Sequence, residues 1–158
     1  MQESVLIPEK RVKVLIKMLA ETEQKLKVKI KIKANVVELD GEGIPLYRAK
    51  MIIKAVARGF APEDAQRLFD EQQQLEIIEL TDLNQKKAER IKSRIIGTGG
   101  KAKYMIEQFT GCKIAICGKT ISLIGGWEQN QNAKHAIEMF KRGAKHASVY
   151  GFLRSIKE

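Results

Sequence analysis

The chain has 158 residues, 44% of them hydrophobic, and its 29 Lys and Arg against 19 Asp and Glu give a net charge of +10. Such a sequence can build a folded core, and its basic excess is typical of a protein that binds a polyanion. No apolar run approaches the roughly 20 residues of a membrane span, and two cysteines without a secretory leader predict a protein of the reducing cytoplasm that contacts no membrane.

The first part of the chain, residues 1–58, is predicted to form a small α+β unit. Its hydrophobic periodicity alternates between strand-like and helix-like, with turn residues at Ala34-Asn35 and at positions 40–43. In chain order the predicted elements are a strand at 4–7, helices at 9–15 and 21–26, strands at 28–33 and 36–40, and a helix at 46–58.

One strand of this unit carries a ladder of lysines on a single face, Lys27, Lys29, Lys31 and Lys33. Residues two apart on a strand point to the same side, so this face is solvated and the other is apolar. Contact with RNA is one interpretation of the ladder. The favoured one is that the lysines protect an edge strand from aggregation.

Residues 59–74 are predicted to be a helical linker. Pro62 is a helix-start signal, and Glu63 and Asp64 follow in the first turn, where acidic side chains favour the helix dipole. Because the segment is acidic overall, it is poorly suited to lie along a phosphate backbone. It is expected to pack the two halves of the chain together or to face a protein partner.

The second part of the chain, residues 75–145, repeats the order of elements of the first. A strand at 75–80 precedes helices at 86–96 and 100–109, strands at 113–117 and 120–124, and a helix at 129–142. Residues 146–158 remain as a C-terminal tail, for which binding to a partner and docking on the core are both open.

The segment at residues 94–101, Arg-Ile-Ile-Gly-Thr-Gly-Gly-Lys, connects the two helices of the second unit. Gly97 and Gly100 bracket a two-residue turn, and glycine lets a backbone approach a phosphate closely. A nucleotide-hydrolase phosphate loop is the rival interpretation. That motif needs a glycine where Ile95 stands and a Ser or Thr where Ala102 stands, so it is rejected.

Basic residues gather around this segment. Residues 86–119 contain nine Lys and Arg against two Glu, a local excess of seven positive charges. Lysines on a scattered surface usually only solvate it. Their clustering beside a phosphate-sized loop favours binding of a nucleic acid.

From Ile96 to Ile114 the sequence resembles the K-homology (KH) consensus without a gap. The segment has Ile-Gly-x-Gly-Gly at 96–100, an apolar helix position at Ile106, Thr-Gly at 110–111 and Lys-Ile at 113–114. The resemblance implies an α+β fold of two tandem type I KH units, each a three-stranded antiparallel sheet packed on helices. We call Gly97 and Gly100 the clamp glycines, and the turn that they bracket the glycine clamp. Aligning Ile16 with Ile96 puts Lys17 and Ala20 in the place of the clamp glycines, so the first unit lacks the clamp.

A KH-type groove holds four nucleotides of a single strand between the glycine turn and the following strand. The predicted RNA-contacting residues are Arg94, Ile96, Gly97, Thr98, Gly99, Gly100, Lys101, Lys103, Lys113, Ile114 and Ile116. The three isoleucines are candidates for an apolar groove wall, with plain core packing an equal alternative. At 6% aromatic residues, a stacking platform of the RRM type is not expected.

Over nearly its whole length the chain resembles archaeal two-KH proteins related to the eukaryotic pre-ribosomal factor partner of Nob. The matching segments are 7–12, 58–63, 75–83, 142–144 and 148–150. This resemblance implies binding of single-stranded RNA near the 3′ end of small-subunit rRNA by the second KH unit. It also implies help to an rRNA-processing endonuclease and to other assembly or initiation factors. The inner pair of the loop is usually basic in that family and here is Thr98-Gly99.

The expected function is therefore a non-enzymatic RNA-binding factor of small-subunit ribosome biogenesis, without cofactor or metal. His135 and His146 have no neighbouring nucleophile in the sequence that would suggest catalysis. A general single-stranded nucleic-acid binder or translational regulator is one alternative function. An RNA hydrolase with an unrecognised site is the other.

Overall fold

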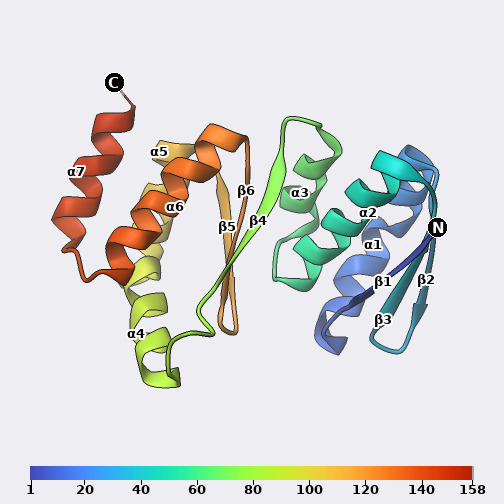
Figure 1. The fold of residues 1–158 in the computed structure, drawn as a ribbon, viewed down its shortest axis with the longest axis horizontal. Helices are drawn as coiled ribbons and strands as arrows, with labels where there is room; N and C mark the ends of the chain where they lie inside the picture. The colour runs from blue at the N-terminus through green and yellow to red at the C-terminus, as the bar shows by residue number, and fades with distance from the viewer. Residues whose placement is uncertain (158) are drawn as a thin grey trace. The chain divides into compact units, whose positions relative to one another are not determined.

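The structure is a computed structural model that describes residues 1–157. The chain divides into two compact α+β units, one of residues 1–71 and one that begins at residue 72 (Figure 1). Each unit contains one three-stranded antiparallel sheet, which confirms the predicted fold class at this level. Across the described residues, no helix combines the length and the apolar character needed to cross a membrane.

The first unit packs two long helices on its sheet. The sheet has the order β1-β3-β2, with β1 at Gln2–Leu6, β2 at Lys29–Lys33 and β3 at Val36–Asp40. The helices are α1 at Glu9–Leu26 and α2 at Gly43–Ala57. Strand residues Val5, Val37 and Leu39 are buried together with the helix residues that face them, which forms the core of this unit.

Helix α1 corrects one prediction. Two helices at 9–15 and 21–26 were expected from the comparison with the second unit, but residues 9–26 form one continuous helix. Positions 17–20 are Lys, Met, Leu and Ala, which are all strong helix formers, and no glycine or proline interrupts them. Met18 is buried within this helix, so the position equivalent to the glycine clamp is a regular helical turn.

The acidic segment after α2 also differs from the prediction of a single linker helix. It forms two short turns, α3 at Pro62–Ala65 and the 3₁₀-helix η1 at Gln66–Phe69, and both lie against α2 within the first unit. Arg48 on α2 donates hydrogen bonds to the carbonyls of Leu68, at 2.7 Å, and Asp70, at 3.0 Å. Ala65 and Leu68 are buried, so this segment completes the first unit.

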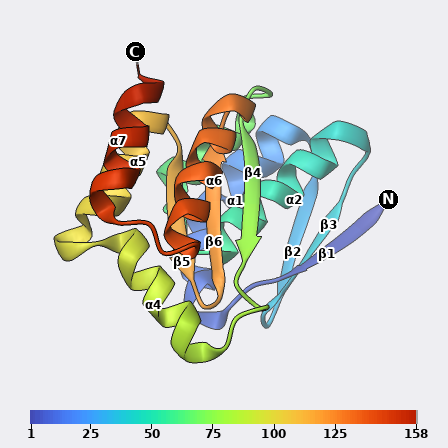
Figure 2. The same cartoon turned by 60° about the vertical axis from the view of Figure 1, so that its left-hand side comes forward.

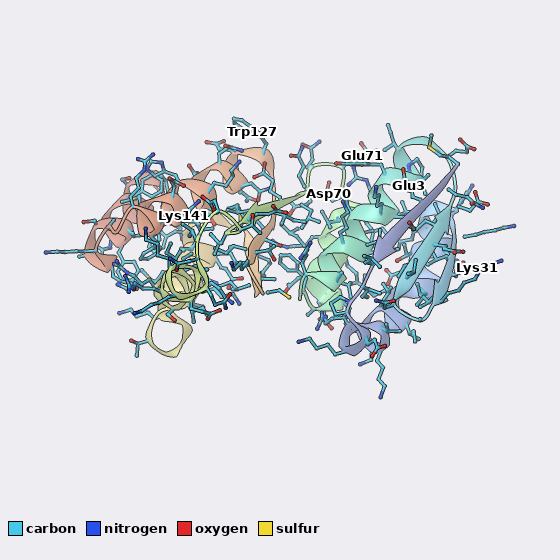
Figure 3. The ribbon with its side chains drawn as sticks, turned by 60° about the horizontal axis from the view of Figure 1, so that its bottom comes forward. Glu3, Lys31, Asp70, Glu71, Trp127 and Lys141 are labelled. Atoms are coloured by element: carbon cyan, nitrogen blue, oxygen red, sulfur yellow. The ribbon has the colours of Figure 1, made fainter. Side chains whose placement is uncertain are left out.

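Three residues of the lysine ladder, Lys29, Lys31 and Lys33, lie on β2, an edge strand of the first sheet, where Figure 3 labels Lys31. Lys27 does not belong to the strand as predicted, because it is the left-handed C-cap of α1. Lys29 pairs in register with Asp40, and Lys31 with Glu38. Lys33 Nζ lies 3.8 Å from a carboxylate oxygen of Glu38. Because acidic residues on β3 stand opposite the lysines, the ladder is locally neutralised. This arrangement favours the protective interpretation of the ladder over contact with RNA.

The second unit has a sheet of order β4-β6-β5 that is covered by helices on one face (Figure 2). Its strands are β4 at Gln74–Glu79, β5 at Lys113–Cys117 and β6 at Thr120–Gly125. Its helices are α4 at Gln85–Ile96, the 3₁₀ turn η2 at Thr98–Gly100, α5 at Lys101–Thr110, α6 at Trp127–Lys141 and α7 at His146–Ile156.

Helix α7 settles the open question about the C-terminal tail, because it packs against α5 and α6. Val149 and Leu153 are fully buried in the same core as Ile106 and Phe140. The apolar positions 149 and 153 are four residues apart and therefore form one face of the helix. The tail is a docked helix of the second unit.

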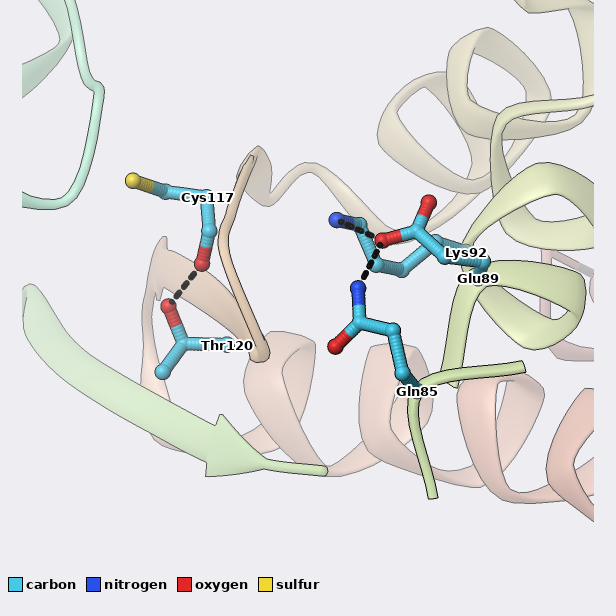
Figure 4. A network of polar contacts seen from close by, with 5 residues as sticks. All are labelled: Gln85, Glu89, Lys92, Cys117 and Thr120. Carbon is cyan, nitrogen blue, oxygen red and sulfur yellow. Dashed lines mark hydrogen bonds and ion pairs between the residues drawn. The ribbon is translucent and has the colours of Figure 1, made fainter. Parts of the chain in front are cut away.

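Local hydrogen bonds hold the β5–β6 hairpin and the first turns of α4 (Figure 4). Thr120 Oγ1 donates to the carbonyl of Cys117 at 2.7 Å and closes the β5–β6 hairpin. On α4, Glu89 accepts from Gln85 at 3.1 Å and from Lys92 at 3.3 Å. The acidic Glu89 therefore neutralises Lys92.

Candidate nucleic-acid interface

The glycine loop, residues 97–100, joins α4 to α5 as predicted, and it depends on glycine conformations. Gly97 has φ 75° and ψ 175°, a combination that is essentially restricted to glycine. Gly99 and Gly100 are left-handed, with φ of 63° and 79°. These conformations bring the chain from the end of α4 directly into α5, so the loop is only one turn long.

The three glycines serve different purposes. A Cβ at Gly97 would lie 2.8 Å from both the Cβ and the backbone nitrogen of Ala102, so Gly97 is needed for the loop to pack on α5. A Cβ at Gly99 or Gly100 would meet nothing within 4 Å. The close approach at Gly97 is thus internal to the protein. Gly99 and Gly100 leave the outer surface of the loop open to a ligand.

Positive charge lies where the loop enters α5. The first amides of a helix have no partner within the helix and favour an anion. Lys101 is exposed at the first position of α5, and Lys103 is half-buried two residues further on. Thr98 is exposed in the loop itself. The surface formed by Thr98, Gly99, Gly100 and Lys101 is therefore suited to contact a phosphate.

The three isoleucines proposed for the groove separate into two kinds. Ile96 is 38% exposed at the end of α4, which fits a groove wall. Ile114 is 3% exposed and belongs to the hydrophobic core, and Ile116 is half-buried against the same core. Of the two interpretations left open, core packing therefore holds for Ile114.

Lys113 begins β5, the strand expected to form the other side of the groove. The next residue, Ile114, donates its backbone N–H to Glu107 Oε2 of α5 at 2.9 Å, which ties the start of β5 to α5. Lys113 is half-buried there. The strand and the helix that follows the glycine loop are thus held in a fixed relation.

Arg94, which was predicted to contact RNA, lies next to the glycine loop and beside Gly97 and Thr98. Its guanidinium donates to the carbonyl of Ala144 and stands 5.8 Å from the centre of the Phe140 ring. His146 Nε2–H donates to the carbonyl of Arg94 at 3.1 Å. Arg94 therefore points to the α7 side of the glycine loop. There it lines a cavity with residues 146 and 150, which sequence reasoning did not place at the site.

Part of the signal for these missed residues was present in the sequence, since residue 150 lies in a segment that matches the family and residue 146 does not. Residues 142–144 and 148–150 match the family, but a tail without a predicted helix gave no means of placing them beside the loop. Elsewhere in residues 1–157, the structure shows no group of three or more His, Cys, Asp or Glu that could hold a metal ion. Cys112 and Cys117 form no disulfide, and Cys112 Sγ donates to Asn130 Oδ1 at 3.1 Å.

Comparison with known proteins identifies the second unit. A family profile for the second KH domain of PNO1 proteins, described as a eukaryotic-type KH domain (KH-domain type I), matches residues 74–158. A KH domain-containing protein of Methanocaldococcus jannaschii is 37% identical over 96% of this chain and 72% of its own length.

Eukaryotic relatives are longer, and the chain spans about half of their length. The RNA-binding protein PNO1 of Oryzias latipes is 31% identical over 70% of this chain and 47% of its own length. The pre-rRNA-processing protein PNO1 of Coccidioides immitis is 30% identical over 70% of this chain and 45% of its own length.

A solved structure matches the whole chain. It is Dim2p of Pyrococcus horikoshii in a complex with a/eIF2alpha and rRNA. It is 37% identical, covers 99% of this chain and 94% of its own, and gives a TM-score of 0.91. With the match of the family profile to more than half of the chain, this likeness shows that the protein belongs to the PNO1 family of KH-domain proteins.

Proposed function

We propose that this protein is a non-enzymatic RNA-binding factor of small-subunit ribosome biogenesis. In this proposal its second unit grips single-stranded rRNA near the 3′ end of the small-subunit RNA and assists its processing. The observation that carries the proposal is the glycine loop, whose outer surface is open at Gly99 and Gly100 and continues into the basic start of α5. A polyanion that is thin enough to reach such a loop is a single strand.

The physical basis of the grip is backbone contact supported by charge. Four nucleotides would run between the glycine loop and β5, with phosphates at the loop amides and at Lys101 and Lys103. Ile96 would contact base faces from the edge of the groove, since it is the most exposed of the three isoleucines. Bases would be selected mainly by shape and by their edges, and phosphates would set the register.

The relatives support the choice of RNA. The Coccidioides immitis relative is a pre-rRNA-processing protein, and the Pyrococcus horikoshii neighbour was solved with rRNA and a/eIF2alpha. We extend both properties to this chain: rRNA as the ligand, and an initiation factor or an rRNA-processing endonuclease as protein partners. The first unit is proposed to be a KH-like domain that docks a protein or contacts RNA weakly, because a regular turn of α1 replaces the clamp.

Competition binding tests the proposal. A labelled fragment of the small-subunit rRNA 3′ end is displaced by the same unlabelled fragment or by a scrambled RNA of equal composition. We expect the native fragment to compete at least about tenfold better, as for single-strand readers that contact base edges. Equal competition would indicate a general single-stranded nucleic-acid binder, and RNA cleavage by the protein alone would contradict a non-enzymatic role.

A further inference from the structure

A cavity of about 430 Å³ opens beside the glycine loop on the side of α7. We name it the α7 pocket, and its lining residues are Ser93, Arg94, Gly97, Thr98, Lys101, His146 and Tyr150. Its volume falls within the range of small-ligand sites. The lining combines cationic, hydroxyl and aromatic groups, which is the chemistry that recognises a nucleotide.

Arg94 is held in place before any ligand arrives. One guanidinium nitrogen donates to the Ala144 carbonyl, and the Phe140 ring lies beneath the group. A guanidinium has five N–H donors in a fixed plane, so donors remain besides the one that Ala144 takes. An arginine fixed in this way is preorganised to hydrogen-bond a phosphate or a base edge.

Two aromatic rings, those of His146 and Tyr150, line the pocket from α7. The centres of the His146 and Tyr150 rings lie 6.1 Å apart, and Lys101 Nζ lies 5.8 Å from the centre of the Tyr150 ring. Tyr150 is half-buried, so part of its ring is open. A base that meets this ring would place its phosphate close to the ammonium of Lys101 and to the glycine loop.

We infer that the α7 pocket binds one further nucleotide of the RNA, directly next to the four that the KH groove holds. This inference rests on the proposed function and extends it. The base stacks on Tyr150, and the phosphate lies between Lys101 and Arg94. Helix α7 follows the sixth element of the strand-helix-helix-strand-strand-helix order, so this subsite is an addition to the groove between the loop and β5.

The test uses the full chain and RNAs cut from the small-subunit rRNA 3′ end to four nucleotides, then lengthened by one nucleotide at either end. Fluorescence anisotropy measures each affinity. Stacking of one base on an aromatic ring is worth roughly 1–3 kcal/mol. We therefore expect an extension at one end to tighten binding by at least about fivefold.

Tyr150→Leu should abolish that gain while leaving the affinity for the four-nucleotide RNA within about twofold, since stacking needs a ring. Tyr150→Phe keeps the ring and should keep the gain. Ser93→Trp is a second variant. Ser93 is exposed, so its replacement removes no core contact, and the larger side chain fills the pocket. It should also block the gain.

The matched control is Trp127→Leu. Trp127 is an exposed aromatic at the start of α6, where Figure 3 labels it, and Gln129 in the same turn lies beside Gly111. Gly111 follows the far end of α5, so ten residues of helix separate this position from the glycine loop. This variant should bind every RNA as the wild type does.

The outcomes are distinct. No binding of any rRNA fragment by the wild type would refute the proposed function itself. Tight binding of the four-nucleotide RNA without any gain from either extension would overturn the α7 pocket alone. Equal reduction of the gain by Tyr150→Leu and Trp127→Leu would also overturn the pocket.

Discussion

Two neighbouring isoleucines at the end of α4 have opposite environments. Ile95 is fully buried in the core of the second unit, and Ile96 is 38% exposed beside the glycine loop. We expect Ile95→Ala to lower the free energy of unfolding by about 2–5 kcal/mol because it leaves a cavity. Ile96→Ala should lower it by less than about 1 kcal/mol but should weaken RNA binding.

Urea denaturation and RNA anisotropy on both variants check this prediction. Similar losses of stability at the two positions would show that Ile96 belongs to the core. Unchanged RNA affinity in Ile96→Ala would remove it from the groove.

The clamp glycines differ in what a methyl group would meet. At Gly100, alanine adds only the cost of a left-handed conformation, about 1–2 kcal/mol. At Gly97, alanine faces a conformation that costs about 1–3 kcal/mol and also overlaps Ala102 at 2.8 Å. We therefore expect Gly97→Ala to lower the melting temperature clearly more than Gly100→Ala. A larger loss at Gly100 in thermal melts followed by circular dichroism would contradict this account.

At this scale the sequence predicted the position of the glycine turn between two helices, which the structure has at residues 97–100. Contact of these residues and of Lys101 with RNA stays a prediction. The sequence predicted that Arg94 contacts RNA but not on which side of the loop, because charge alone does not show the direction of a side chain. The contact with Ala144 joins residues 50 positions apart and depends on how α7 docks. Such a contact cannot be predicted from the residues that surround Arg94 in the sequence.

At the scale of elements, we expect the glycine loop to bind RNA by lying close to one of its phosphates. Thr98→Asp combined with Gly99→Asp puts two negative charges on an exposed turn, where Cβ at residue 99 has open space and aspartate tolerates the left-handed conformation. We expect RNA affinity, measured by anisotropy, to fall at least about tenfold through repulsion.

Two controls accompany this double variant. Thr98→Asn with Gly99→Asn makes similar changes in shape without charge and should lose much less affinity. Ile16→Asp with Ala20→Asp adds the same two charges at exposed positions of α1, and it should leave RNA binding nearly unchanged. Equal losses in the two charged pairs would contradict the division of labour between the two units.

The strands of the second unit and the helices around its loop follow from hydrophobic period and glycine punctuation, and β5 has the predicted bounds. Helix α1 shows the limit of reasoning by internal similarity. In the second unit glycines interrupt the helix. Residues 17–20 of the first unit favour helix in their own right, so the similarity between the units does not extend to a helix break there. Helix α7 was missed although Val149, Leu153 and Ile156 recur at helical spacing, because the repeated order of elements ended before this segment.

For the molecule as a whole, we expect only some of the basic residues behind the net charge of +10 to contact RNA. Each phosphate neutralised on a single strand lowers the slope of log affinity against log salt by about 0.7. A groove of four nucleotides predicts a slope of about −2 to −4. Lys103→Ala should make that slope shallower by somewhat less than one unit and weaken all RNA sequences alike.

Lys31→Ala is the matched control, because Lys31 is an exposed lysine that stands opposite Glu38 in the first sheet. It should leave the slope unchanged. Anisotropy titrations at several salt concentrations measure both variants. An affinity independent of salt would mean that the basic surface around the glycine loop is not the binding surface.

Two hydrogen bonds join the last turn of α4 to the start of α7, one from Arg94 to Ala144 and one from His146 back to Arg94. They tie the turn between α6 and α7 to the end of α4, next to the glycine loop. The end of α4 that carries the glycine loop is therefore anchored before RNA arrives. RNA that docks there orders few further residues, so a few phosphate contacts can hold it with little loss of conformational entropy.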